Sequence, residues 1–232
     1  YNRGVDMHQA PYVHGLFRDV FTGVDTRQKK AIPIGELHML LNKDPQSEKL
    51  RRTQAIANLL FQFCGMPFSD LAHLEKSNLE RGLLKYNRTK TGTPMSIEVL
   101  ESAQNAIGGL YNKSDARSSG YPDYLFRILS GAYKRNEEGA YREYQSALRR
   151  FNNELKSLSR KLRLHSPVTS YTLRHSWATT AKYRGVPIEM ISESLGHKSI
   201  KTTQIYLKGF ELEERTKVNK LNYSYVCNFK ML

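Results

Sequence analysis

The sequence predicts a mainly α-helical domain with a small antiparallel β-sheet. Residues 47–63 and 136–164 carry apolar side chains at helical spacing, which indicates two amphipathic helices. Residues 83–86 and 95–99 read as short strands on either side of a turn that contains glycine and proline. With 232 residues and 39% hydrophobic content, the chain is long enough to bury one sizeable core.

The two ends of the chain differ from this central region. Glycine and proline interrupt residues 1–30, which end in a basic run, so we expect a linker or the end of a preceding domain. The main domain is then expected over residues 31–220. Residues 221–232 form an apolar and aromatic tail, which must bury itself either on its own domain or on a neighbouring protomer.

The first half of the main domain contains three shorter predicted helices. One is expected over residues 33–41 and another over residues 101–111, which the polar loop 112–121 follows. The helix over residues 47–63 has an apolar side formed by Leu50, Ile56, Leu59, Leu60 and Phe63.

The longest helix is expected over residues 136–164. Its apolar stripe consists of Tyr141, Tyr144, Leu148, Phe151, Leu155 and Leu158. Its other face carries the cations Arg149, Arg150, Lys156, Arg160 and Lys161. A solvated basic face is the ordinary explanation of such a run, and contact with DNA phosphates is the alternative.

Residues 171–206 read as three short helices joined by tight turns. Thr169 or Ser170 is expected to cap the first helix, Gly185 to end it, and Ser199 to cap the third. By spacing alone, this outline also fits a helix-turn-helix, in which Thr202, Thr203 and Gln204 face a DNA groove.

Charge and cysteine content narrow the functional class. The formal net charge is +14, which predicts a polyanionic partner, with nucleic acid as the default. No run of about 18 apolar residues is present, so we expect no membrane-spanning helix. Cys64 and Cys227 match neither a disulfide framework nor a zinc-ligand spacing, and a reducing cytoplasm fits this usage.

The stretch from Tyr171 to Tyr206 resembles the second conserved box of the tyrosine recombinases, the phage-integrase family. That box reads His-x-x-Arg-His, then Leu-Gly-His, then Tyr nine residues later. Arg174 and His175 match the first part of the box, and His197 matches the histidine of the second part. Tyr206 follows His197 by nine residues, as in the family. The first histidine of the box is replaced here by Tyr171.

The chemistry of strand exchange suits these residue types. A tyrosine phenolate that attacks phosphorus keeps the bond energy as phosphotyrosine. The resemblance implies Tyr206 as nucleophile, Arg174 and His197 at the phosphate, Tyr171 as a hydrogen-bond donor and His175 in support. An arginine fits the attacked phosphate because its planar fork matches two oxygens and stays charged.

The resemblance extends to the predicted hairpin, where Lys90 matches the family's general-acid lysine. The first box, Gly-x-Arg-x-x-Glu in the family, has Asp70 at its acidic position as an orienting group, but Pro67 replaces its catalytic arginine. We expect Arg88 to supply the missing cation, because residues two apart on a strand leave the same face and Arg88 would join Lys90. Arg81 is a weaker substitute, since it precedes a glycine in a turn.

Together these features imply site-specific DNA recombination through a 3′-phosphotyrosine, as in the integrase of a phage or conjugative transposon. The implied partners are double-stranded DNA, further copies of the chain in a tetramer, and an accessory DNA-bending protein. Lys198 and Lys201 are further candidates for contact with the DNA. No metal, other cofactor or membrane is implied, and the place of action would be the bacterial cytoplasm at the nucleoid. A preceding core-binding domain is expected to end within residues 1–30. The alternatives are a DNA-binding protein without cleavage activity and a type IB topoisomerase.

Overall fold

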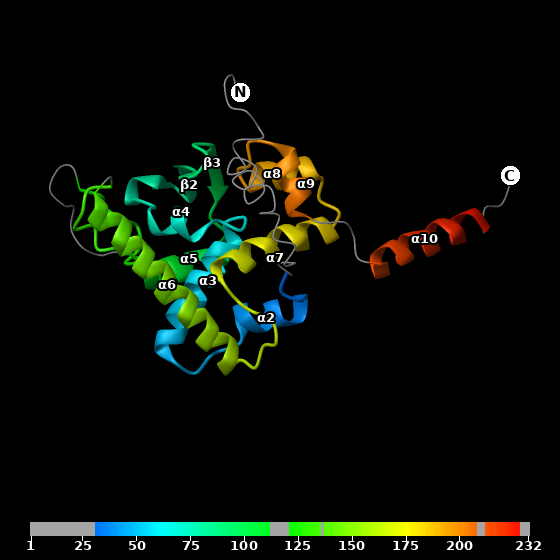
Figure 1. The fold of residues 1–232 in the computed structure, drawn as a ribbon, viewed down its shortest axis with the longest axis horizontal. Coiled ribbons are helices and arrows are strands. Elements are labelled where there is room, and N and C mark those ends of the chain that lie inside the picture. The colour runs from blue at the N-terminus through cyan, green and yellow to red at the C-terminus, as the bar shows by residue number, and fades with distance from the viewer. Residues whose placement is uncertain (1–30, 112–120, 136, 208–211, 228–232) are drawn as a thin grey trace, which may run out of the picture. The chain divides into compact units, whose positions relative to one another are not determined.

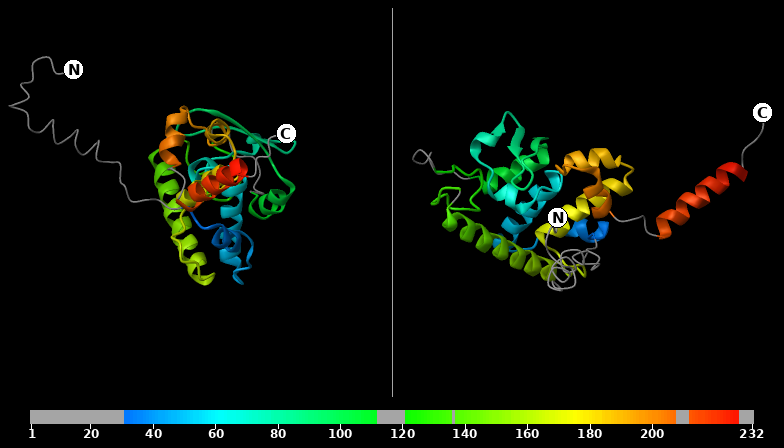
Figure 2. Two further views of the ribbon diagram at one scale, coloured as in Figure 1. Left: turned by 90° about the vertical axis from the view of Figure 1, so that its right-hand side faces the viewer. Right: turned by 45° about the horizontal axis from the view of Figure 1, so that its top comes forward.

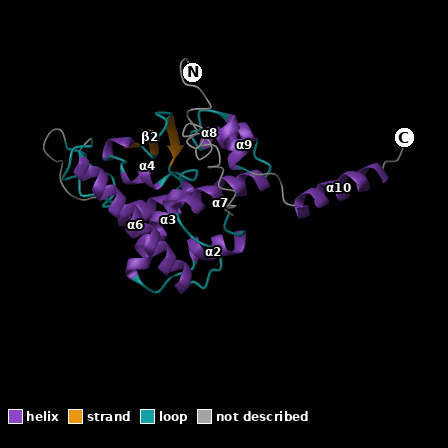
Figure 3. Cartoon of the chain, in the orientation of Figure 1, coloured by secondary structure: helices purple, strands orange, loops and turns teal. Residues whose placement is uncertain are grey.

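The computed structural model describes residues 31–111, 121–135, 137–207 and 212–227, and these are mainly helical (Figures 1 and 3). The α-helices are α2 (Ile34–Asn42), α3 (Glu48–Gln62), α4 (Phe68–Ala72), α5 (Glu101–Leu110), α6 (Glu138–Lys161), α7 (Ser170–Tyr183), α8 (Ile188–Ser194), α9 (Ile200–Tyr206) and α10 (Leu212–Cys227). The strands are β1 (Leu79–Glu80), β2 (Leu83–Asn87) and β3 (Pro94–Glu98), and a short 3-10 turn covers Lys76–Asn78. The predicted fold class is confirmed.

Helix α3 is the central element of the core. It packs against α5, α6 and α7, because its apolar side chains recur at a spacing of three and four residues. Its buried Thr53 hydroxyl also donates to Glu154 on α6 at 3.0 Å. The largest fully buried side chains are Phe63, Phe126, Leu40, Leu59, Leu60, Met66, Leu71, Leu74, Leu84, Leu125, Leu155 and Leu158.

The sheet is antiparallel in the order β1-β2-β3. Leu84 pairs with Ile97 and Tyr86 with Met95, so the apolar side chains of the hairpin gather on its inner face. The predicted hairpin is therefore confirmed. The two-residue strand β1 was not predicted, because a segment this short has no readable alternation.

Helices α7 and α9 begin at the predicted caps, and α7 ends at the predicted glycine turn. The Thr169 hydroxyl accepts a hydrogen bond from the Thr172 N–H and caps α7, and Ser199 caps α9 in the same way. Gly185 ends the α7 segment with a φ of +78°, which only glycine adopts easily. A second small core of Ala178, Ile191, Leu195 and Leu207 holds the three helices together.

Two expectations differ from the structure. Tyr141 was placed in the apolar stripe of α6 but is 64% exposed, because the buried face of the helix includes Ala140 and Tyr141 is turned about 100° from it. Helix α10 continues to Cys227, so the boundary expected between residues 220 and 221 falls inside it. Residues 1–30 and nearly all of the loop 112–121 lie outside the described residues. No helix in the described part of the chain is long and apolar enough to cross a membrane.

Candidate active site

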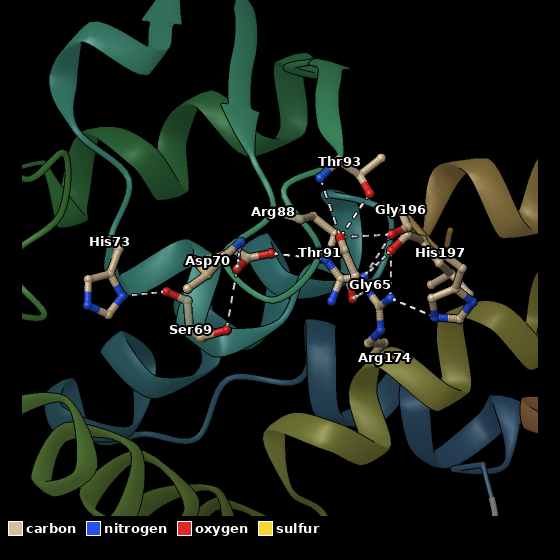
Figure 4. A network of polar contacts seen from close by, with 12 residues as sticks. Gly65, Ser69, Asp70, His73, Arg88, Thr91, Thr93, Arg174, Gly196 and His197 are labelled. Atoms are coloured by element: carbon tan, nitrogen blue, oxygen red, sulfur yellow. Dashed lines mark hydrogen bonds and ion pairs between the residues drawn. The ribbon is translucent and has the colours of Figure 1, made fainter. Parts of the chain in front are cut away.

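Five segments from different parts of the chain meet in one polar cluster. They are the turn after α3, the short helix α4, the turn after β2, helix α7, and the loop between α8 and α9 (Figure 4). Figure 1 shows α8 beside β3, and a Cβ on Gly196, which follows α8, would lie 2.7 Å from Sδ of Met95 on β3. The predicted site residues Arg174, Arg88, His197 and Asp70 all belong to this cluster.

Arg174 is the centre of the cluster. It is 6% exposed on α7, and its guanidinium donates to the Gly65 carbonyl at 2.8 Å and to the Leu195 carbonyl at 2.7 Å. Its Nη2 also lies 3.2 Å from Nε2 of His197. These partners fix the plane of the fork, which is the property needed to hold a phosphate.

Arg88 reaches the same point from the opposite side. It is 7% exposed, and its Nη1 donates to the carbonyls of Leu195 and Gly196. The Leu195 carbonyl thus accepts from both Arg88 and Arg174, which places two guanidinium groups side by side. Among the described residues, the partners of Arg88 contact Nη1 and Nε, which leaves Nη2 for a ligand.

The reason given for Arg88 from strand alternation is wrong, although its position near Arg174 is as expected. Strand β2 ends at Asn87, and the chain then turns, with the Arg88 N–H donating to the Thr93 carbonyl and the Gly92 N–H to the Arg88 carbonyl. Arg88 therefore points inward, whereas Lys90 is exposed at the tip of the turn.

Asp70 is what draws Arg88 inward. Its side chain is 1% exposed, and Oδ2 lies 3.4 Å from Nε of Arg88. Its Oδ1 accepts hydrogen bonds from the Thr89 N–H at 3.1 Å and from the Ser69 hydroxyl at 3.4 Å. A buried carboxylate needs such compensation, so Asp70 and Arg88 stabilise each other's position.

Gly196 makes room for Arg88. Its φ is +64°, and a Cβ at this position would lie 2.4 Å from Cδ of Arg88 and 2.7 Å from Sδ of Met95. Any other residue here would displace the arginine or the methionine.

His197 is a neutral imidazole with a defined tautomer. Burial, followed by the positive charges of Arg174, Arg88 and Lys90, lowers its pKa to about 4. Arginine only donates, so Nε2 must accept from Arg174, and the proton therefore sits on Nδ1. That proton is donated to the Thr203 hydroxyl at 2.8 Å.

Thr203 is fully buried, so the helix-turn-helix interpretation, in which Thr203 faced a DNA groove, is wrong for this residue. Thr202 and Gln204 are exposed. Thr203 and the Leu195 carbonyl were not predicted from the sequence as parts of the site. The only signal for Thr203 was its place in the short stretch between His197 and Tyr206.

The tyrosines occupy different settings. Tyr206 is the last residue of α9, and its side chain lies outside the described atoms. Tyr171 is 43% exposed in the first turn of α7, and His175 beside Arg174 is half-buried. Tyr86 also lies near the guanidinium groups, but burial raises its pKa, which keeps it a phenol.

The predicted DNA-contacting cations fall into two groups. Lys198 and Lys201 are exposed beside His197 and at the start of α9. The exposed set on α6 consists of Arg149, Arg150, Lys156, Arg160 and Lys161. The C-terminal end of α6 lies at the opposite end of the domain from α8 (Figures 1 and 2), so the structure does not bring that end into the cluster.

The cluster can hold a phosphate between two arginines, with an imidazole and a lysine nearby. In the described part of the chain, no group of three or more His, Cys, Asp or Glu side chains is arranged to hold a metal ion.

The chain is a member of the phage integrase family, whose model matches residues 34–212. It is 30% identical over 190 residues to the tyrosine recombinase XerD of Halalkalibacterium halodurans, covering 78% of this chain and 57% of that protein. It is 28% identical over 204 residues to a probable integrase/recombinase of Methanocaldococcus jannaschii, covering 85% and 58%.

Solved structures show the same fold. The crystal structure of XerA recombinase superposes with a TM-score of 0.56 at 22% identity, covering 87% of this chain and 64% of that one. The Tn1549 transposon integrase in complex with circular intermediate DNA gives 0.57 at 16% identity, covering 85% and 68%. The chain spans less than three fifths of the length of the two curated relatives.

Proposed function

We propose that this chain is the catalytic domain of a site-specific DNA recombinase that cuts and rejoins DNA through a 3′-phosphotyrosine. The observation that carries the proposal is the pair of guanidinium groups of Arg174 and Arg88, which share the Leu195 carbonyl beside His197. Helix α9, which starts three residues after His197, ends at Tyr206.

In this proposal each residue has a separate task. Tyr206 attacks the phosphorus, and Arg174 and Arg88 neutralise the charge that develops on the non-bridging oxygens. His197 takes up a proton on Nε2 when the phosphate binds and donates it to a non-bridging oxygen, and exposed Lys90 protonates the leaving 5′-oxygen. Tyr171 donates a hydrogen bond, and Asp70 and His175 hold their neighbours in place.

Pro67 is compatible with cleavage under this assignment. The cation that the family places at position 67 is supplied from the β2–β3 turn, where Asp70 holds Arg88 against Arg174. The second arginine needed for the transition state is thus present, which favours a cleaving enzyme over a purely DNA-binding protein.

The proposed substrate is double-stranded DNA, in agreement with the charge of +14. Relatives in solved structures are bound to DNA, including the Tn1549 integrase with circular intermediate DNA. We propose further that copies of the chain assemble as a tetramer on DNA, with the tail beyond residue 220 docking on a neighbouring copy. An accessory DNA-bending protein and a bacterial cytoplasmic setting complete the proposal.

The test uses a nicked DNA substrate that traps a covalent intermediate. A protein–DNA band that resists denaturation is expected with the wild-type chain and not with Tyr206→Phe, while both bind DNA equally. Joining of strands from two separate sites distinguishes a recombinase from a topoisomerase, which would relax supercoils without joining partners. No covalent band with the wild-type chain would refute the proposal.

A further inference from the structure

We propose that Thr203 is a positioning residue of the reaction: its buried hydroxyl fixes the tautomer and ring orientation of His197, so that Nε2 faces the phosphate-binding arginines. The inference rests on the proposed function, because only cleavage gives Nε2 a substrate to contact.

The first support is the geometry at the imidazole. Nδ1 of His197 lies 2.8 Å from Oγ1 of Thr203, and Nε2 lies 3.2 Å from Nη2 of Arg174. The two hydrogen bonds engage both ring nitrogens. Rotating the ring by 180° about the Cβ–Cγ bond would break both of them, so the pair selects a single orientation.

The second support is the direction of the hydrogen bonds. Arg174 has only N–H groups to offer, so Nε2 must present its lone pair. Nδ1 of the neutral ring then carries the hydrogen, and the hydroxyl of Thr203 accepts it. A hydroxyl suits this place because it accepts as readily as it donates, and it keeps hold of Nδ1 if Nε2 also takes up a proton when a phosphate arrives.

The third support is the position of Thr203 in the fold. It is fully buried on α9, one turn before Tyr206, and it contacts a residue of the preceding loop. The same hydrogen bond therefore ties the helix that carries the nucleophile to the group beside the phosphate. Thr53 on α3 is also fully buried, and its hydroxyl donates to Glu154 outside the polar cluster, so it provides a matched control.

The variants are Thr203→Val, which has nearly the same shape without the hydroxyl, Thr203→Ser, which keeps the hydroxyl, and the control Thr53→Val. Single-turnover cleavage of the nicked substrate should fall about 10- to 100-fold in Thr203→Val, which is the range found for groups that orient metal-binding histidines. Thr203→Ser should stay within about threefold of the wild type, and Thr53→Val should cleave normally. DNA affinity should be unchanged in all three.

Imidazole ¹⁵N spectra of the DNA-free protein provide a readout that packing alone would not move. The wild type and Thr203→Ser should show His197 with its hydrogen on Nδ1, and Thr203→Val should show a shift toward the Nε2–H form. A wild-type ring with its hydrogen on Nε2, or an unchanged tautomer in Thr203→Val, would overturn the inference. So would an equal reduction of cleavage in the Ser and Val variants. If the wild-type chain forms no covalent intermediate, the proposed function fails, and the spectra still decide the role of Thr203.

Discussion

Removing Arg88 should separate its two tasks, which are to compensate Asp70 and to clamp the phosphate. The side chains of Asp70 and Arg88 are 1% and 7% exposed, and Oδ2 lies 3.4 Å from Nε. Arg88→Met alone leaves a buried carboxylate without its cation, which costs roughly 3–5 kcal/mol of folding free energy. Removal of one electrostatic interaction with the transition state costs a further factor of about 10²–10³ in rate.

The double variant Asp70→Asn/Arg88→Met removes the first cost and keeps the second. The asparagine introduced in this variant is neutral, and its amide oxygen can still accept from the Thr89 N–H, as Asp70 does. We therefore expect the free energy of unfolding, measured by urea denaturation, to recover to within about 1–2 kcal/mol of the wild type. Single-turnover cleavage should remain about 10²–10³ slower, as in Arg174→Ala.

The controls come from the same region. Asp70→Asn alone keeps Arg88 on the Leu195 and Gly196 carbonyls and should cleave much faster than the double variant. Arg81→Ala, on the exposed turn before β2, should cleave nearly normally. If the double variant recovers both stability and cleavage, Arg88 is only the structural partner of Asp70, and another cation must replace the one missing at Pro67.

Three further predictions test the surroundings of the site. Gly196→Ala should slow cleavage at least tenfold, because the new Cβ would meet Cδ of Arg88. Gly185 also has a positive φ, but a Cβ there would meet nothing within 4 Å, so the control Gly185→Ala should lower the stability by only about 1–2 kcal/mol and leave cleavage unchanged. Equal cleavage by the two variants would contradict the steric argument. The pKa of His197 is about 4 in the folded chain and 6.5 in the unfolded chain, so the unfolded chain binds more protons between these pH values. The wild type should therefore lose stability relative to His197→Gln as the pH falls from 6.5 to about 4. A stability difference that stays constant with pH would refute a lowered pKa for His197. In a plot of log affinity for DNA against log salt concentration, Lys198→Ala/Lys201→Ala should reduce the slope by roughly 0.9 for each phosphate that is no longer neutralised. The control Lys156→Ala/Lys161→Ala removes the same charge and should reduce the slope less. A larger reduction in the control would place the DNA on α6.

The local motifs of the site could be predicted from sequence because their spacing fixes their geometry. Arg174 and His197 lie 3.2 Å apart, as expected of residues that act together in the second box. The caps at Thr169 and Ser199 set the start of α7 and α9, and they were readable for the same reason.

The non-local parts of the site could not be derived in this way. Arg88 lies near Arg174, but the strand alternation used to predict its position does not apply, because β2 ends one residue before Arg88. The turn from Arg88 to Thr93 is instead held by its own hydrogen bonds and by Asp70. The Leu195 carbonyl, where both arginines converge, is a backbone group with no signature in the sequence.

The exposure of two residues differs from what their sequence patterns predict. Thr203 has the sequence pattern of an exposed polar residue, yet it is buried because α9 packs against the His197 loop. Tyr141 has the pattern of a core residue, yet it is exposed because it is turned about 100° around α6 from the buried Ala140. A neighbouring element thus buries Thr203, whereas Tyr141 lies beside the face that α6 buries.

The most direct test of the account is the identity of the residue that becomes joined to DNA. The trapped complex would be digested with trypsin and nuclease, and the peptide carrying a nucleotide would be sequenced by mass spectrometry. The account predicts a nucleotide joined through its 3′-phosphate to Tyr206, in the peptide that spans residues 202–208. A nucleotide on Tyr171, on any other residue, or joined through a 5′-phosphate would contradict it.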